Sequence, residues 1–145
     1  MNEPSHRHSG SCHCGAIAMD LAFTQPAEEM QVRSCQCGFC IRQGSLTVSE
    51  AAGRAVITVA ADQLTTYSFG SGTASFLICA RCGVYAGVIM ADGEKWLSIA
   101  NARGLGIEAF RNRTGVPLTH DGEATDDRLA RRKSRWTPTE IRYRL

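Results

Sequence analysis

Cys79-Ala80-Arg81-Cys82-Gly83 has the form of a zinc knuckle, in which two thiolates converge on one metal ion. The two residues between the cysteines set the spacing, and Gly83 permits a tight turn whose N–H groups face the sulfur atoms. One such motif is a weak signal, because cysteines at this spacing also serve redox chemistry. The metal interpretation therefore depends on the remaining cysteines.

Five more cysteines stand in two clusters nearer the N-terminus. The first is Cys12-His13-Cys14-Gly15, with thiols at positions i and i+2 that point to the same face of an extended chain. The second is Cys35-Gln36-Cys37-Gly38-Phe39-Cys40, which offers three thiols. The total of seven is odd and nothing indicates an oxidising compartment, so metal ligation is favoured over disulfides.

The seven thiols divide as four plus three. Cys35, Cys37 and Cys40 reach one ion from a single segment, which leaves two pairs, Cys12/Cys14 and Cys79/Cys82, to close a four-thiolate structural site. The triplet lacks a fourth thiolate, and an open position is typical of a catalytic or labile zinc. We predict two zinc ions per chain. The fourth ligand of the second ion stays open, as does the alternative that the triplet is a set of reduced thiols.

Strand signals dominate the rest of the chain, with apolar residues at alternate positions or in short runs. Strands are expected near 16–23, 45–49, 54–59, 64–69, 74–78, 84–90 and 96–100. A helix is expected over 123–133, and the end of the chain, 140–145, is left open between helix and strand. This pattern predicts a mainly β, antiparallel, zinc-stapled single domain with little helix.

We place this domain at residues 9–145, after a flexible N-terminal arm over 1–8. The arm is polar and no apolar stretch is long enough to span a bilayer, so we expect neither a signal peptide nor a membrane span. The expected location is the cytoplasm.

Basic residues concentrate at the end of the chain. Between positions 128 and 145 the sequence has seven of them against a single acidic residue, Glu140. Such a segment binds anions or is simply the solvated face of a terminal segment. For an acidic small molecule the candidates are Arg42, Arg81 and the 131–135 run. Trp96 and Trp136 are expected to be core aromatics.

Together, the three cysteine motifs resemble the glutathione-dependent formaldehyde-activating enzyme family, which also includes centromere protein V. The family pattern is Gly-x-Cys-x-Cys-Gly, then Cys-x-Cys-x-x-Cys, then Cys-x-x-Cys-Gly, and it covers roughly residues 9–100 here. Gln36 and Gly38 replace a histidine and a serine that are frequent in the central motif, and Ile78 and Val84 flank the last one.

The resemblance implies a β-tent fold with a structural zinc on the two pairs. It also implies a second, catalytic zinc held by Cys35, Cys37 and Cys40, which makes these the predicted catalytic residues. The named activity is condensation of glutathione with formaldehyde to S-hydroxymethylglutathione, a carbon–sulfur lyase reaction.

Three hypotheses follow. The favoured one is a zinc-dependent carbon–sulfur lyase or synthase whose partners are a small thiol such as glutathione and an aldehyde. The alternative is a non-catalytic zinc module that binds protein or nucleic acid through the basic C-terminal segment. The third is a thiol sensor that releases zinc on oxidation. No membrane partner is expected, nucleic acid is the less favoured partner, and the oligomeric state stays open.

Overall fold

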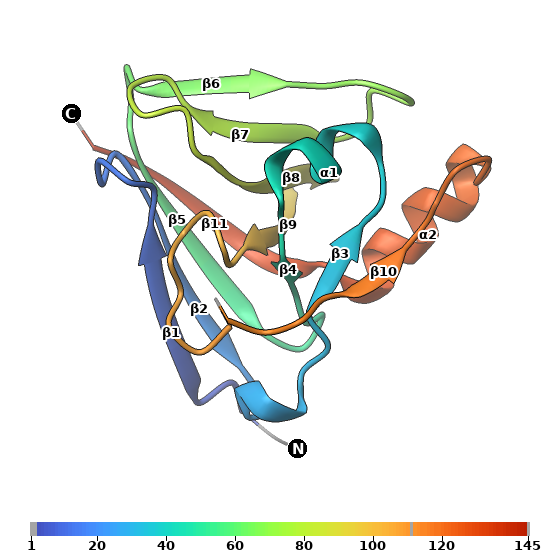
Figure 1. Ribbon diagram of the computed structural model, residues 1–145, viewed down its shortest axis with the longest axis horizontal. Coiled ribbons are helices and arrows are strands. Elements are labelled where there is room, and N and C mark those ends of the chain that lie inside the picture. Colours follow the sequence, from blue (N-terminus) through green and yellow to red (C-terminus); the bar gives the residue numbers. More distant parts are fainter. Residues whose placement is uncertain (1–2, 111, 145) are drawn as a thin grey trace.

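The computed structural model describes residues 3–110 and 112–144 (Figure 1). The strands are β1 (His6–Ser11), β2 (Ile17–Phe23), β3 (Arg33–Cys35), β4 (Thr47–Val48), β5 (Arg54–Ala60), β6 (Leu64–Tyr67), β7 (Ser75–Cys79), β8 (Tyr85–Asp92), β9 (Lys95–Asn101), β10 (Val116–Leu118) and β11 (Thr137–Arg144). The helices are α1 (Gly38–Gln43) and α2 (Thr125–Arg135), and a 3-10 turn covers Ala27–Glu29. The prediction of a mainly β chain with little helix is confirmed.

All of these strands belong to one branched sheet. Its main path runs β1-β2-β5-β11-β9-β4-β3-β10, and the hairpin strands β6, β7 and β8 branch from β9. In Figure 1 the strands β1, β2, β5 and β11 run along one flank, whereas β6, β7 and β8 lie across the top. Strand β9 pairs with β8, β4 and β11, so it joins the two groups.

Two strand pairs depart from the expected antiparallel pattern. β11 pairs parallel with β5, and β10 pairs parallel with β3. Two parallel neighbouring strands must be joined by a long crossover connection. Here several other elements lie in sequence between β5 and β11, and likewise between β3 and β10. The C-terminal segment, left open by the sequence, is therefore a strand that inserts between β5 and β9.

The N-terminal segment differs from the expected flexible arm. His6, Arg7 and His8 begin β1, which pairs antiparallel with β2 over its whole length. The half-buried ring of His8 packs against Phe110, with ring centroids 5.0 Å apart, and lies 6.1 Å from Phe23. β1 has no apolar side chain, so the alternation that marks a half-buried strand is missing from its sequence.

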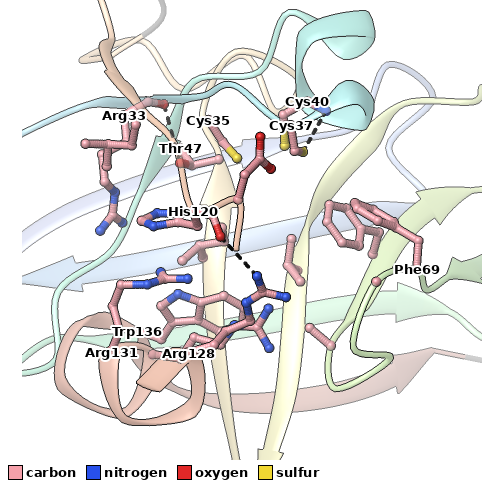
Figure 2. A pocket seen from close by; sticks show the side chains of 18 of the residues that line it. Arg33, Cys35, Cys37, Cys40, Thr47, Phe69, His120, Arg128, Arg131 and Trp136 are labelled. Atoms are coloured by element: carbon pink, nitrogen blue, oxygen red, sulfur yellow. Dashed lines mark hydrogen bonds between the residues drawn. The ribbon is translucent and has the colours of Figure 1, made fainter. Parts of the chain in front are cut away.

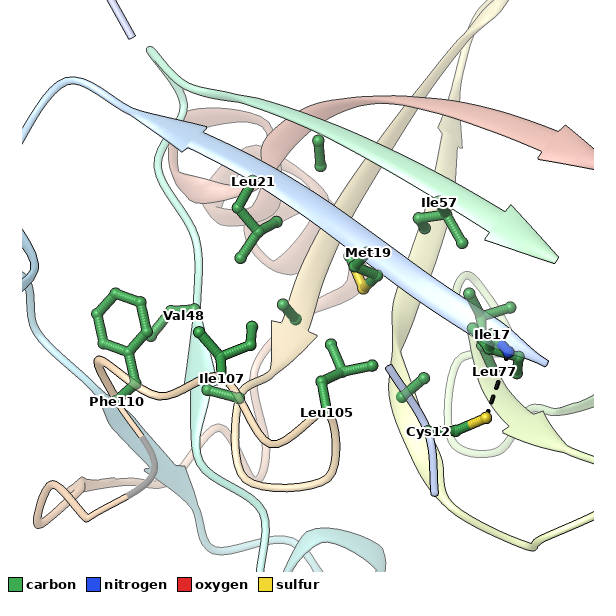
Figure 3. Packing of buried hydrophobic residues seen from close by; sticks show 14 of the residues in the cluster. Cys12, Ile17, Met19, Leu21, Val48, Ile57, Leu77, Leu105, Ile107 and Phe110 are labelled. Atoms are coloured by element: carbon green, nitrogen blue, oxygen red, sulfur yellow. Dashed lines mark hydrogen bonds between the residues drawn. The ribbon is translucent and has the colours of Figure 1, made fainter. Parts of the chain in front are cut away.

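The main core lies on the inner face of β2 and β5 (Figure 3). On β2, Ile17, Met19, Leu21 and Phe23 alternate with less buried residues, and the loop that carries Leu105, Ile107 and Phe110 covers them. Cys12 is buried in the same cluster, and the Ile17 N–H donates to its sulfur over 3.2 Å. One predicted metal ligand is thus fixed by the core itself.

A second, smaller core lies where α2 meets β8 and β9. It contains Tyr85, Val88, Leu97 and Trp136. Trp136 is only 5% exposed, as predicted, whereas Trp96 is 40% exposed, so its assignment to the core was wrong. Trp96 lies at the exposed start of β9, next to the turn that follows β8, and the buried part of the strand begins only at Leu97.

Within the described residues, no helix is long and apolar enough to cross a membrane.

We expect Gly10→Ala to lower the free energy of unfolding by about 1–3 kcal/mol. A Cβ atom at Gly10 would overlap the carbonyl oxygen of Leu105 and lie 2.7 Å from Cγ1 of Ile107. Urea denaturation of the metal-loaded protein measures the change. The control is Arg7→Ala, on an exposed position of the same strand. Equal stability of the two variants would show that β1 is not held against the 105–107 loop.

Candidate metal centre and pocket

The two cysteine pairs meet in one cluster. The sulfur atoms of Cys12, Cys14, Cys79 and Cys82 all lie within 4.8 Å of one another. The Cys12 and Cys14 sulfurs are 3.8 Å apart, and those of Cys14 and Cys79 are 3.5 Å apart. A tetrahedral ion with metal–sulfur bonds of ~2.3 Å separates its sulfurs by about 3.8 Å, so the cluster has the dimensions of a four-thiolate metal site.

Two similar turns present these sulfurs. Gly15 N–H donates to the Cys12 carbonyl over 3.0 Å, and Gly83 N–H donates to the Cys79 carbonyl over 2.9 Å. Both glycines have a positive φ, 85° and 81°, which other residues adopt at a cost. The expected glycine turns are present. Cys12 and Cys14 however lie in a turn after β1 and not on an extended strand, so the turn makes their sulfurs converge.

The triplet lies at the junction of β3 and α1. Cys35 ends β3, Cys37 caps the N-terminus of α1, and Cys40 lies in its first turn. The Cys40 N–H donates to the Cys37 sulfur over 3.3 Å, and the three sulfurs lie within 4.8 Å of one another. This short helix was not predicted, because its six residues are too few for a helical period to be seen.

One thiol of the triplet, that of Cys35, ionises more readily than an ordinary cysteine. The Cys40 thiol donates a hydrogen bond to Cys35 and lowers the pKa of Cys35 to about 5. The same bond, with burial, raises the pKa of Cys40 far above its ordinary value. Further ionisation at this spacing is opposed by repulsion unless a cation is present. The donor set therefore fits a metal ion that binds thiolates.

The triplet opens into a cavity of about 390 Å³, which the four-cysteine cluster does not line (Figure 2). Figure 2 shows the three thiols on one side, the side chains of Arg128 and Arg131 on the opposite side, and His120 between them. No histidine, aspartate or glutamate of the described residues joins the three sulfurs as a further ligand within that 4.8 Å. A metal ion there keeps a position that faces the cavity.

Arginines also line the cavity. Four of them among the described residues, Arg128, Arg131, Arg132 and Arg135, come from α2, and a fifth, Arg33, comes from β3, two residues before Cys35. Glu123 pairs with two, accepting from Arg128 over 3.3 Å and from Arg131 over 3.0 Å. No ion pair within 3–110 and 112–144 involves the other three.

Arg132 and Arg33 are charged groups that burial penalises. The Arg132 guanidinium lies 5.0 Å from the ring centre of Trp136 and donates to Thr73 Oγ1 over 2.7 Å, but its buried Nε has no partner among the described residues. Burial and neighbouring arginines lower the pKa of both Arg132 and Arg33 to about 10. An anion bound in the cavity would relieve this electrostatic cost.

Sequence reasoning identified part of this wall. Arg131, Arg132 and Arg135 were candidates for an acidic ligand and line the cavity, whereas Arg42 and Arg81 do not. Arg128 was included only as a member of the basic C-terminal segment, and Arg33 was not named for this role. Arg33 arrives from a strand far from the basic C-terminal segment, so only the pairing of β3 with β10 and β4 brings it close.

Two further residues of the cavity had no sequence signal. His120 lies beside Cys35, and burial together with Arg131 lowers its pKa. Tyr85 is fully buried, and its hydroxyl lies near Cys40 and pairs with no described atom. Both are brought to the triplet by strand and loop packing that a single sequence does not encode locally.

The sequence model of the glutathione-dependent formaldehyde-activating enzyme family matches residues 7–103. The chain belongs to this family. The match contains all seven cysteines and ends before α2, so the arginines of that helix lie outside it. Among solved structures, a Rhodobacter sphaeroides protein is 24% identical, with a TM-score of 0.47 over 94% of this chain and 99% of that one.

We expect Cys82→Ala and Cys37→Ala to behave differently. Removing Cys82 breaks the cluster that joins the turn after β1 to the turn after β7, so the variant should lose that metal ion and most of its stability. Cys37→Ala should stay folded and lose only the triplet ion. Native mass spectrometry counts the ions, and urea denaturation measures the stability. If Cys37→Ala unfolds and Cys82→Ala does not, the assignment of structural and open sites is reversed.

Proposed function

We propose that this protein is a zinc-dependent enzyme that joins glutathione to formaldehyde, a reaction of the carbon–sulfur lyase class. One observation carries the proposal: three thiols that can hold an ion open into a cavity whose opposite wall is rich in arginine. Membership of the family supports both substrates. Under this proposal Cys12, Cys14, Cys79 and Cys82 hold a structural zinc, and Cys35, Cys37 and Cys40 hold the reactive one.

The reaction is an addition. The thiol sulfur of glutathione attacks the carbonyl carbon of formaldehyde, a carbon–sulfur bond forms, and the electron pair of the C=O π bond moves to oxygen. The proton lost by the thiol ends on that oxygen, so nothing is oxidised or reduced. When bound, zinc supplies positive charge that favours a thiolate at neutral pH or polarises the carbonyl oxygen.

The side chains of the cavity have separate roles. Arg33, Arg132 and Arg135 have no carboxylate partner among the described residues, and they orient the two carboxylates of glutathione. His120 stands between arginines and thiols, and its lowered pKa keeps the ring neutral, able to accept or donate a proton. Holding the thiol end at the triplet and the carboxylates at the arginines fixes the sulfur for attack.

The competing hypothesis of a module that binds nucleic acid receives less support. Several basic residues of the C-terminal segment line the cavity next to the triplet, which is large enough for a small anion. Of those outside it, Arg142 pairs with Glu140 over 3.1 Å and Lys133 with Asp92 over 3.6 Å. The basic segment is thus divided between a cavity wall and locally paired surface charges.

Glutathione should act on one of the two metal sites. In protein loaded with cobalt in place of zinc, glutathione should change the thiolate-to-cobalt absorption of the triplet site, because that ion has an open position. The four-thiolate site should keep its spectrum. Formaldehyde and glutathione should condense faster than they do spontaneously, and Cys37→Ala should abolish the excess rate. An unchanged spectrum together with the spontaneous rate would contradict the enzyme hypothesis.

Arg132→Gln should weaken glutathione binding about tenfold or more, since charge-assisted hydrogen bonds to a carboxylate contribute on the order of 1.5–3 kcal/mol. Isothermal titration calorimetry measures the affinity, and circular dichroism checks the fold. Arg54→Gln, at an exposed position of β5 away from the cavity, is the matched control and should bind within about twofold of the parent. If both variants bind equally, the arginine wall does not hold the carboxylates.

A further inference from the structure

A row of aromatic rings runs from the triplet to the mouth of the cavity. It begins at buried Tyr85, whose hydroxyl lies near Cys40. The Phe76 ring centroid is 5.5 Å from that of Tyr85, and the Phe69 centroid is 5.0 Å from that of Phe76. All three rings line the cavity. In Figure 2 Phe69 stands apart from the arginine wall, on another side of the cavity.

The outer end of this row is open to solvent. Phe69 is 39% exposed and the neighbouring Tyr67 is 48% exposed, although their ring centroids are only 5.6 Å apart. Rings that only fill a core are buried on all sides, and these two are not. A cluster of exposed aromatic rings beside a cavity is typical of a surface that an apolar ligand covers.

The substrates of the proposed reaction leave this surface uncovered. Formaldehyde has a single carbon and a volume on the order of one water molecule, about 30 Å³. Glutathione is polar along its length, and its carboxylates are directed to the arginines. The cavity of about 390 Å³ also presents Val88 and Ile99, so its apolar lining extends beyond the three rings and has no counterpart in the single carbon of formaldehyde.

We propose that, besides formaldehyde, this protein joins glutathione to aldehydes that carry an aryl group, which lies along the row formed by Tyr85, Phe76 and Phe69. This inference rests on the proposed function and extends its aldehyde substrate. The thiol sulfur adds to the carbonyl carbon of the aryl aldehyde and the thiol proton ends on the oxygen, which gives a hemithioacetal. The sulfur and carbonyl lie at the triplet, and the aryl group extends toward the mouth.

The expected selectivity follows from ring burial. A phenyl group placed against these rings loses contact with water on the face that meets them and gains edge-to-face or offset contacts with its neighbours. An adduct with a phenyl group should therefore bind at least about tenfold more tightly than one with a methyl group.

Two stable conjugates test this in the zinc-loaded protein. S-benzylglutathione and S-methylglutathione are titrated by calorimetry, and the benzyl conjugate should bind at least about tenfold more tightly. Phe69→Ala, at a partly exposed position that tolerates truncation, should reduce this ratio by about threefold or more without changing the affinity for the methyl conjugate. Tyr143→Ala, an exposed aromatic on β11 outside the cavity, should leave the ratio unchanged.

The outcomes separate the two proposals. Equal affinities for the conjugates, in a protein that still accelerates the condensation of glutathione with formaldehyde, overturn the aryl inference and leave the proposed function standing. A ratio that Phe69→Ala and Tyr143→Ala reduce equally also overturns it. If neither conjugate binds and formaldehyde reacts only at the spontaneous rate, both proposals fall. Faster formation of the benzaldehyde hemithioacetal, followed by NMR, with a Michaelis constant raised by Phe69→Ala, supports both.

Discussion

Four sulfur atoms from two turns far apart in the sequence, one near the N-terminus and one in the middle of the chain, converge within 4.8 Å, and the rest of the structure depends on this meeting. The turn after β1 and the turn after β7 are 65 residues apart along the chain, yet the Cys14 and Cys79 sulfurs are 3.5 Å apart. Thiolates at that distance repel one another unless a cation lies between them. A metal ion bound there would cancel the repulsion between the thiolates and cross-link the β1–β2 flank to the β6–β8 layer.

The second constraint is the crossover that returns the chain to the sheet. After β10 pairs with β3, α2 carries the chain back so that β11 inserts parallel to β5 and antiparallel to β9. The helix begins with acidic residues and ends with basic ones, as its dipole favours. Its arginines consequently face the strand that supplies Cys35, and the cavity between them is a product of topology.

The local features of the fold could be predicted from the sequence, whereas most contacts between distant segments could not. Strands such as β2 and β5 were predictable because Ile17 to Phe23 alternates apolar with smaller or polar residues and Arg54 to Ala60 contains a short run rich in β-branched residues. The grouping of the cysteines was predictable because thiol spacing is local chemistry. β1 was not predictable, since it contacts the rest of the protein through a glycine and a histidine. The parallel pairing of β10 with β3 and of β11 with β5 was not predictable either. The cavity wall from Arg33 and the place of His120 likewise depend on pairings far apart in the chain.

The two cysteine clusters differ in what surrounds them, and under the proposed function this difference would make them two kinds of site. Four thiolates with a divalent ion would sum to two negative charges, at a place where Cys12 and Cys79 are buried in the main core. Three thiolates with the same ion would sum to a single negative charge, and the adjoining cavity contains arginines without carboxylate partners among the described residues. An anionic ligand would therefore be repelled only weakly by the cysteine triplet with its ion and attracted strongly by the arginines of the cavity. Because the attraction acts at the wall and the open position lies at the triplet, a ligand that satisfies both must be anionic at one end and nucleophilic at the other, as a thiol peptide is.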